Sequence, residues 1–142
     1  MSYVNIMVHA VWRTHNHEPV LVREKREQLF QHILTNAKSK GIYIDILNGH
    51  VDHVHCLISL GADQSIGGVM KLIKGEAAHW ANKEKLFNPR FVWAEDYYAV
   101  SLSKTAVGTV RNYIRNQEEH HKKKTFIAEY EEYMKEHGFL LG

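Results

Sequence analysis

Two hydrophobic periodicities alternate along this chain, and their order restricts the fold more than any other feature of the sequence. Apolar residues recur at every second position, the period of a β-strand, in three segments: residues 3–12, 42–46 and 53–60. A fourth segment, 91–102, is rich in apolar and aromatic residues and also predicts a strand. Between them, apolar residues recur every three to four positions, the period of a helix, over 22–40 and 66–81. Ser65 is the expected N-cap of the second helix, and Asn48-Gly49 is expected to form the turn before the third strand.

The order strand, helix, strand, strand, helix, strand is that of the ferredoxin-like, split βαβ fold. We therefore predict an α/β (α+β) domain in which two helices cover one face of a four-stranded antiparallel sheet. A third helix is expected from Lys104 to about Lys123, and the other face of the sheet is left for this helix or for a ligand. A fourth, charged helix is expected from Thr125 to His137, and the fourth strand is expected to be irregular at Glu95-Asp96.

The composition is typical of one globular domain and excludes several classes of protein. The chain of 142 residues suits a single domain over 1–142, and its 44% hydrophobic and 24% charged residues argue against disorder. No apolar run approaches the roughly 18 residues of a membrane span, and the N-terminus lacks a secretory signal pattern. The single cysteine, Cys56, fits a reducing compartment, so the cytoplasm is the expected location. A net charge of +2 does not by itself indicate a nucleic-acid-binding protein.

Two histidines mark the third predicted strand. Because side chains alternate between the faces of a strand, His53 and His55 share one side, while Cys56 belongs to the apolar side that meets the helices. Two imidazoles on one face can bind a metal ion together; the alternative is that they are polar residues on a solvated face of the sheet. Asp52 is a candidate to orient one imidazole, and His50 is either a third ligand or a solvated residue of the turn.

A tyrosine and a glutamine lie one turn apart in the predicted third helix. Tyr113 and Gln117 are therefore neighbours on one face, at the border of an apolar stripe, where a tyrosine can also be a residue of the core edge. A glutamine carbonyl is a hard oxygen donor that suits Mg²⁺ or Mn²⁺ and would complete a site begun by two histidines. A phenol held near such an ion can act as a covalent nucleophile, and these groups suffice to transfer a DNA phosphodiester onto tyrosine.

These motifs resemble those of a known family. The sequence DHVHC at 52–56 resembles the HUH motif of histidine, hydrophobic residue and histidine, and YIRNQ at 113–117 resembles the tyrosine-helix motif of single-tyrosine HUH transposases. Three further segments are similar to the same family: residues 11–21, 71–75 and 93–101. The similarity runs from about Tyr3 to Gly138, and it is to the small transposases of the IS-two-hundred type insertion sequences.

The resemblance implies a metal-dependent DNA strand transferase. His53, His55 and Gln117 are implied to hold Mg²⁺ or Mn²⁺. Tyr113 is implied to attack single-stranded DNA and leave a 5′-phosphotyrosine and a free 3′-hydroxyl. The resemblance further implies a homodimer that recognises hairpins at the ends of an insertion sequence, without a membrane partner. In such a dimer, the tyrosine helix can serve its own subunit or the partner.

Several alternatives stay open at the level of sequence. Five basic residues are candidates for contacts to DNA phosphates or are solvated surface charges: Arg13, Lys71, Lys74, Arg111 and Arg115. A domesticated relative would process chromosomal hairpin repeats, and a non-catalytic module would bind single-stranded nucleic acid without chemistry at Tyr113. A hydrolase with zinc on His50, His53 and His55 would form no covalent adduct with its substrate.

Overall fold

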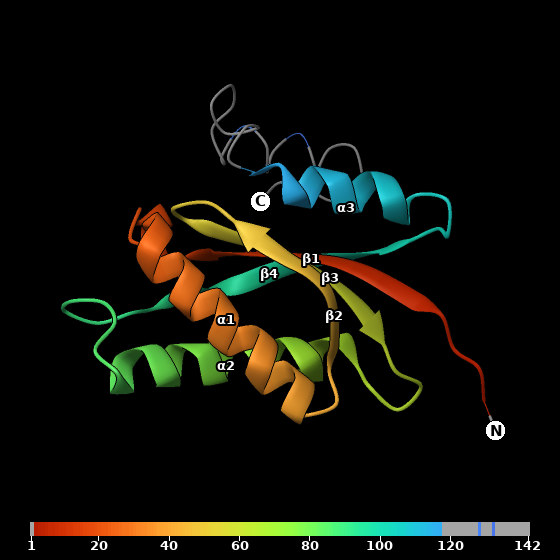
Figure 1. The fold of residues 1–142 in the computed structure, drawn as a ribbon, viewed down its shortest axis with the longest axis horizontal. Coiled ribbons are helices and arrows are strands. Elements are labelled where there is room, and N and C mark those ends of the chain that lie inside the picture. The colour runs from red at the N-terminus through yellow and green to blue at the C-terminus, as the bar shows by residue number, and fades with distance from the viewer. Residues whose placement is uncertain (1, 118–127, 129–131, 133–142) are drawn as a thin grey trace.

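A computed structural model describes residues 2–117, Ala128 and Glu132 of the chain (Figure 1). Its elements follow in the order β1 (Ile6–Thr14), η1 (His15–His17), α1 (Arg23–Ser39), β2 (Tyr43–Gly49), β3 (His53–Leu60), α2 (Ile66–Lys83), β4 (Trp93–Leu102) and α3 (Val107–Arg115). The expected end of the third helix near Lys123 and the expected helix from Thr125 to His137 lie outside the continuous described segment. No helix in the described part of the chain is long and apolar enough to cross a bilayer.

The four strands form one sheet in the order β2-β3-β1-β4, and every pair of neighbours is antiparallel. Helices α1 and α2 cover one face, while α3 lies across the opposite face (Figure 1). This arrangement confirms the predicted ferredoxin-like α+β fold. It also shows that the third helix covers the second face of the sheet.

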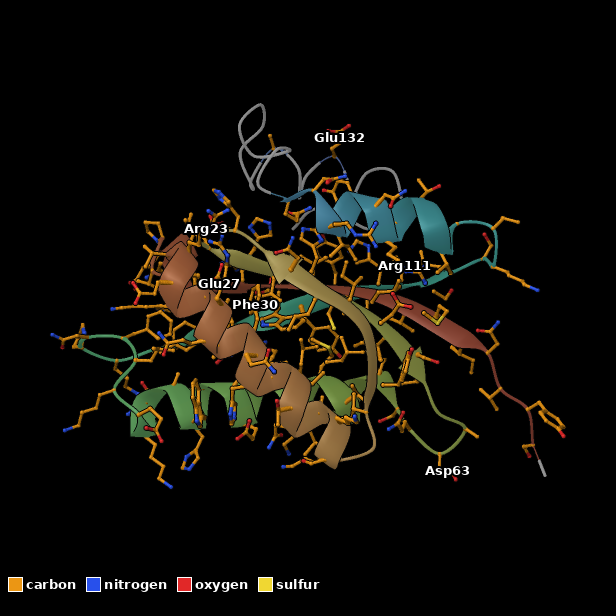
Figure 2. The ribbon with its side chains drawn as sticks, in the orientation of Figure 1. Arg23, Glu27, Phe30, Asp63, Arg111 and Glu132 are labelled. Atoms are coloured by element: carbon orange, nitrogen blue, oxygen red, sulfur yellow. The ribbon has the colours of Figure 1, made fainter. Side chains whose placement is uncertain are left out.

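The hydrophobic core lies between the sheet and the helices α1 and α2. Trp12 of β1 and Val54 of β3 alternate onto this face, and Phe30 of α1 (Figure 2) and Met70 of α2 meet them. Cys56 is fully buried in the same cluster, and burial raises the pKa of its thiol far above the usual range. The thiol is therefore a packing group, as its strand position predicts. The predicted N-cap is also confirmed, because the Ser65 side chain accepts a hydrogen bond from the backbone N–H of Gly68 at 3.0 Å.

The turn predicted at Asn48-Gly49 is wrong. Both residues belong to β2, where Asn48 pairs with His55 and Gly49 pairs with Val54, and the connection to β3 lies at residues 50–52. A Cβ atom at Gly49 would collide with the backbone carbonyl oxygen of His53. Glycine is therefore required at this position because the two strands approach closely, and not because of the conformation of a turn.

The irregularity predicted in β4 is confirmed. The register between β1 and β4 shifts between Trp12 and Thr14, so β4 bulges over residues 94–96. The Lys74 ammonium reaches across from α2 and donates hydrogen bonds to the carbonyl oxygens of these three residues, at 2.9, 3.0 and 3.3 Å. Burial of this amine lowers the pKa of Lys74. A lysine of α2 thus supplies hydrogen bonds where the bulge interrupts the strand ladder.

Helix α3 packs over β2 and β3, where a buried apolar residue and two polar side chains help to fix it. Ile114 is fully buried beneath the helix. The Arg111 guanidinium, which faces the sheet in Figure 2, donates two hydrogen bonds to the Asp45 carboxylate, at 2.7 and 2.8 Å. The Asn48 amide donates to the carbonyl oxygens of Ile114 and Arg115, at 2.9 and 3.1 Å, where the helix ends and its carbonyls lack intrahelical partners. The position of α3 is therefore specified at the middle of the helix and at its C-terminal end.

A side chain at Gly49 should destabilise the hairpin that carries the histidine pair. Gly49→Ala is expected to lower the free energy of unfolding by about 1–3 kcal/mol, because the methyl group would force β2 away from the His53 carbonyl. Gly75→Ala is the matched control, since a Cβ atom there meets nothing within 4 Å. This control should raise the stability by about 0.5–1 kcal/mol, because alanine is the better helix former. Urea unfolding measures both changes, and an unchanged stability of Gly49→Ala would contradict the expected clash.

The ion pair under α3 should make the stability of the protein depend on pH. The hydrogen bond from Arg111 lowers the pKa of Asp45 below its usual value. A carboxyl group of this kind stabilises the fold above its unfolded pKa of about 3.9, and this contribution is lost as the pH falls through the lower, folded pKa. Asp45→Asn should therefore be less stable than the unmodified protein at pH 7, and the difference should shrink towards pH 2.

Urea unfolding at several pH values measures this difference. Asp63→Asn is the matched control, because Asp63 is an exposed acid of the loop before α2 and lies far from α3 (Figure 2). It should change the stability little at either pH. Equal stabilities of Asp45→Asn and the unmodified protein at pH 7 would show that the ion pair does not hold the helix.

Candidate active site

Between α3 and the sheet, polar side chains are buried beside apolar ones such as Ile114. His9 from β1 and His53 and His55 from β3 all lie on this face. Their exposed fractions are 1%, 0% and 0%, and Gln117 beyond the end of α3 is also 0% exposed. The alternative of a solvated histidine pair is therefore wrong, because α3 packs over β2 and β3 and removes both imidazoles from water.

His53 lies between a carboxylate and an amide. Its Nδ1 is 2.9 Å from Oδ1 of Asp52, and its Nε2 is 3.0 Å from Oε1 of Gln117. The contact with Asp52 is the orienting hydrogen bond that the sequence predicted. Since a carboxylate oxygen accepts, the His53 Nδ1–H donates to it, and Nε2 is the nitrogen directed towards Gln117.

His55 contacts a residue that the sequence did not single out. Its Nδ1 is 2.9 Å from Nε2 of His9, and the two rings stack with centroids 5.2 Å apart at an angle of 25°. The sequence shows only that His9 and Val11 lie on the same side of the first strand. It does not show which residue His9 contacts, because that depends on the register between β1 and β3, which is set by tertiary pairing.

Tyr113 lies over the histidines of its own chain. Its ring centroid is 5.5 Å from that of His55 and 6.5 Å from that of His9, in edge-on geometry with both. One helical turn later, the Gln117 amide donates to the Tyr113 carbonyl oxygen at 3.4 Å. The predicted proximity of tyrosine, glutamine and histidine pair is therefore present within a single chain.

The donor set fits a divalent cation. His53 and His55 offer imidazole nitrogens and Gln117 offers an amide oxygen, so three protein ligands would leave positions for substrate or water. A hydrogen bond from the second nitrogen of an imidazole to a carboxylate is typical of metal-binding histidines, and His53 has one. Within the described residues, no three His, Cys, Asp or Glu side chains form a metal-binding group. The zinc site on His50, His53 and His55 is therefore not supported, and the amide oxygen of Gln117 is the candidate third donor.

Two of the five candidate DNA-binding cations have structural roles. Lys74 donates to the carbonyls of the β4 bulge, and Arg111 is held by Asp45. A phosphate contact at either residue would compete with these bonds. The basic character of α2 and α3 is thus used partly to hold the fold together.

The other three candidates are more accessible. Arg13 lies 3.2 Å from an oxygen of Asp96, in a partly exposed ion pair. Lys71 is exposed on α2, on the side of the sheet opposite to α3. Arg115 is exposed at the end of α3, where it donates to the Asn112 side chain at 2.9 Å. Of these three, Arg115 belongs to the helix that carries Tyr113.

A separate cavity of about 500 Å³ opens between α2 and the start of β4. Its lining includes Lys74, His79, Asn82, Arg90 and Phe91. Helix α2 covers the opposite face of the sheet from α3 (Figure 1), so this cavity is distinct from the group of histidines.

Comparisons with known proteins identify relatives of this chain. Residues 2–117 match the family model described as transposase, IS200 like. The chain is 27% identical over 115 residues to the ISDra2 transposase TnpA of Deinococcus radiodurans, in an alignment that covers 77% of this chain and 81% of that protein. The matched span includes the histidine pair, the tyrosine and the glutamine.

Two solved structures share the fold. A putative transposase from Deinococcus radiodurans R1 superposes with a TM-score of 0.64 at 23% identity, covering 82% of this chain and 95% of that one. A REP-associated tyrosine transposase bound to a REP hairpin superposes with a TM-score of 0.61 at 14% identity, covering 87% of this chain and 71% of that one. With the family model matching most of its length, this chain belongs to the IS200-like transposase family.

Proposed function

We propose that this transposase cleaves and rejoins single-stranded DNA at the ends of an insertion sequence through a covalent bond to Tyr113. The observation that carries the proposal is the convergence of two distant segments beneath α3. Gln117 and His53 are 64 residues apart in the sequence, and their side chains are 3.0 Å apart. The Tyr113 ring lies 5.5 Å from that of His55. A nucleophile and metal-binding groups at one place are the parts that this chemistry needs.

The proposed metal ligands are His53, His55 and Gln117, and the proposed ion is Mg²⁺ or Mn²⁺. Bound there, the ion would polarise the scissile phosphoryl oxygen and stabilise the charge that develops in the transition state. Asp52 holds the His53 ring in a fixed orientation. Helix α3 excludes water from both imidazoles, which strengthens electrostatic interactions within the site.

In the proposed reaction, Tyr113 is the nucleophile. Its phenol oxygen forms a bond to phosphorus while the bond from phosphorus to the 3′ oxygen breaks. The tyrosine loses its proton and the 3′ oxygen ends as a hydroxyl, so neither water nor ATP is consumed. The product is again a phosphodiester, and therefore a DNA 3′-hydroxyl can attack it and restore a continuous strand. The ring is only partly buried, which leaves it open to a substrate.

The proposed ligand is DNA with hairpin ends. One structural relative is a transposase bound to a REP hairpin, which supports a ligand of this kind. We further propose that the chain acts in the cytoplasm as a homodimer, as the family resemblance implies. In this proposal each tyrosine helix serves the histidine pair of its own subunit, because Arg111 and Asn48 already fix α3 over that pair.

Tyr113→Phe should abolish the covalent adduct. A labelled single-stranded oligonucleotide that carries a hairpin, incubated with protein and Mg²⁺ or Mn²⁺, should give a protein–DNA adduct on a denaturing gel. Loss of the phenol oxygen should lower adduct formation roughly a thousandfold or more, because no other group replaces the nucleophile. Tyr43→Phe is the matched control, since Tyr43 is 63% exposed on β2 and should react normally.

The same assay separates the alternative functions. His53→Ala should stop cleavage and leave hairpin binding intact, and a chelator or fully duplex DNA should prevent the adduct. Continued cleavage by Tyr113→Phe would contradict the tyrosine mechanism and favour hydrolysis. Hairpin binding without any adduct from the unmodified protein would favour a non-catalytic binding module.

Arg115 and Lys74 should respond differently to loss of their charge. We propose that Arg115 contacts a DNA phosphate, so Arg115→Gln should weaken hairpin binding and reduce the slope of log affinity against log salt by about 1. Lys74→Met should instead lower the free energy of unfolding by about 1 kcal/mol, because it removes the donor to three carbonyl oxygens. Hairpin binding in a salt titration and urea unfolding measure the two effects. An unchanged salt slope in Arg115→Gln would contradict the phosphate contact.

A further inference from the structure

His9 contacts a proposed metal ligand, although neither sequence motif of the family includes it. Its side chain is 1% exposed and its Nε2 lies 2.9 Å from Nδ1 of His55. Both imidazoles are buried, and a buried polar atom without a hydrogen bond carries a large cost in free energy. The short contact is therefore a hydrogen bond, with one ring donating and the other accepting.

The direction of this hydrogen bond decides which atom of His55 can bind a metal ion. A neutral imidazole carries one hydrogen, so one of its nitrogens donates and the other has a lone pair. If His55 donates from Nδ1, its Nε2 has the lone pair and can act as a ligand. If His9 donates instead, the hydrogen of His55 lies on Nε2 and blocks that atom. Only His9 acting as the acceptor is compatible with a metal ion at Nε2 of His55.

The two histidines of the pair are held by different chemical groups. His53 donates to a carboxylate of Asp52, which adds negative charge behind the ring. His55 meets the imidazole of His9, which can accept the same kind of hydrogen bond without adding a negative charge. The stacked arrangement also limits rotation of the His55 ring, because the two centroids are only 5.2 Å apart. Each proposed ligand thus has a partner at Nδ1, which leaves Nε2 as the nitrogen that would bind a metal ion.

We propose that His9 is a positioning residue that keeps His55 in the Nδ1–H tautomer and directs the Nε2 lone pair to the metal ion. This inference rests on the proposed metal-dependent function. The backbone register supports it, since His9 pairs with Leu57, two residues beyond His55 on the same face of β3. Val11, not His9, lies directly opposite His55, so the contact is diagonal and needs the reach of a long side chain.

Nitrogen-15 NMR of histidine-labelled protein tests the tautomer directly. The protein is metal-free and DNA-free, at a pH of about 8, where ordinary imidazoles are neutral. We expect the His55 ring to carry its hydrogen on Nδ1, with its signals assigned by their loss in His55→Ala. A hydrogen on Nε2 of His55 would overturn the inference. Because neither metal nor DNA is present, this result does not depend on whether the proposed reaction is correct.

Mn²⁺ binding tests the consequence for the site, with electron paramagnetic resonance measuring the free ion. His9→Leu should weaken Mn²⁺ binding by about 10–100-fold, as loss of a partner behind a ligand does. His9→Gln should retain most of the affinity, because its amide oxygen can accept from His55 Nδ1. Val11→Ala is the control for packing, since Val11 is fully buried on the same face of β1.

Each outcome has a separate meaning. Unchanged Mn²⁺ affinity in His9→Leu would overturn the positioning role. Equal losses in His9→Leu and Val11→Ala would do the same, because they would indicate a general packing effect. Failure of the unmodified protein to bind Mn²⁺ would overturn the proposed metal site, and the tautomer measurement would still decide the hydrogen-bond direction at His9.

Discussion

The docking of α3 across β2 and β3 is the interaction on which the rest of the site depends. An ion pair, two hydrogen bonds to the end of the helix and a buried isoleucine fix its position. Without this cover, His53 and His55 would lie on a solvated sheet face, and Tyr113 would have no fixed relation to them. The packing of α3 therefore removes the imidazoles from water, places the amide of Gln117 against His53 and places the Tyr113 ring beside the histidine pair.

Strand β3 shows how one segment serves two purposes. Its alternation sends Val54 and Cys56 into the core with α1 and α2, and sends His53 and His55 to the face under α3. The core side is apolar and needs only volume and shape. The α3 side also buries the apolar Leu57, but each of its two imidazoles is polar and needs a hydrogen-bond partner, which Asp52 and His9 provide. The stability of the domain and the geometry of the site thus depend on the same strand through different interactions.

Much of the fold followed from local pattern, and the exceptions have physical causes. Strand and helix periods, the Ser65 cap and the β4 irregularity are local properties, and the structure confirms them. The turn at Asn48-Gly49 failed because a glycine can be required by conformation or by close approach, and the sequence does not distinguish the two. Charge alone makes Lys74 and Arg111 candidates for DNA contacts or solvated surface charges. Their acceptors, the β4 carbonyls and Asp45, lie on other elements, and only the packing of those elements revealed them.

The sequence by itself determined the fold class, the shared face of His53 and His55, and the pairing of Tyr113 with Gln117 along one helix. These follow from the side-chain periods of a strand and a helix, two and 3.6 residues, which relate residues only a few positions apart in the chain. Tertiary structure alone decided that the tyrosine lies over the histidines of its own chain, and that His9 lies behind His55. Both depend on strand register and helix docking between residues far apart in sequence, where the competing arrangements differ in packing and hydrogen bonding rather than in local pattern.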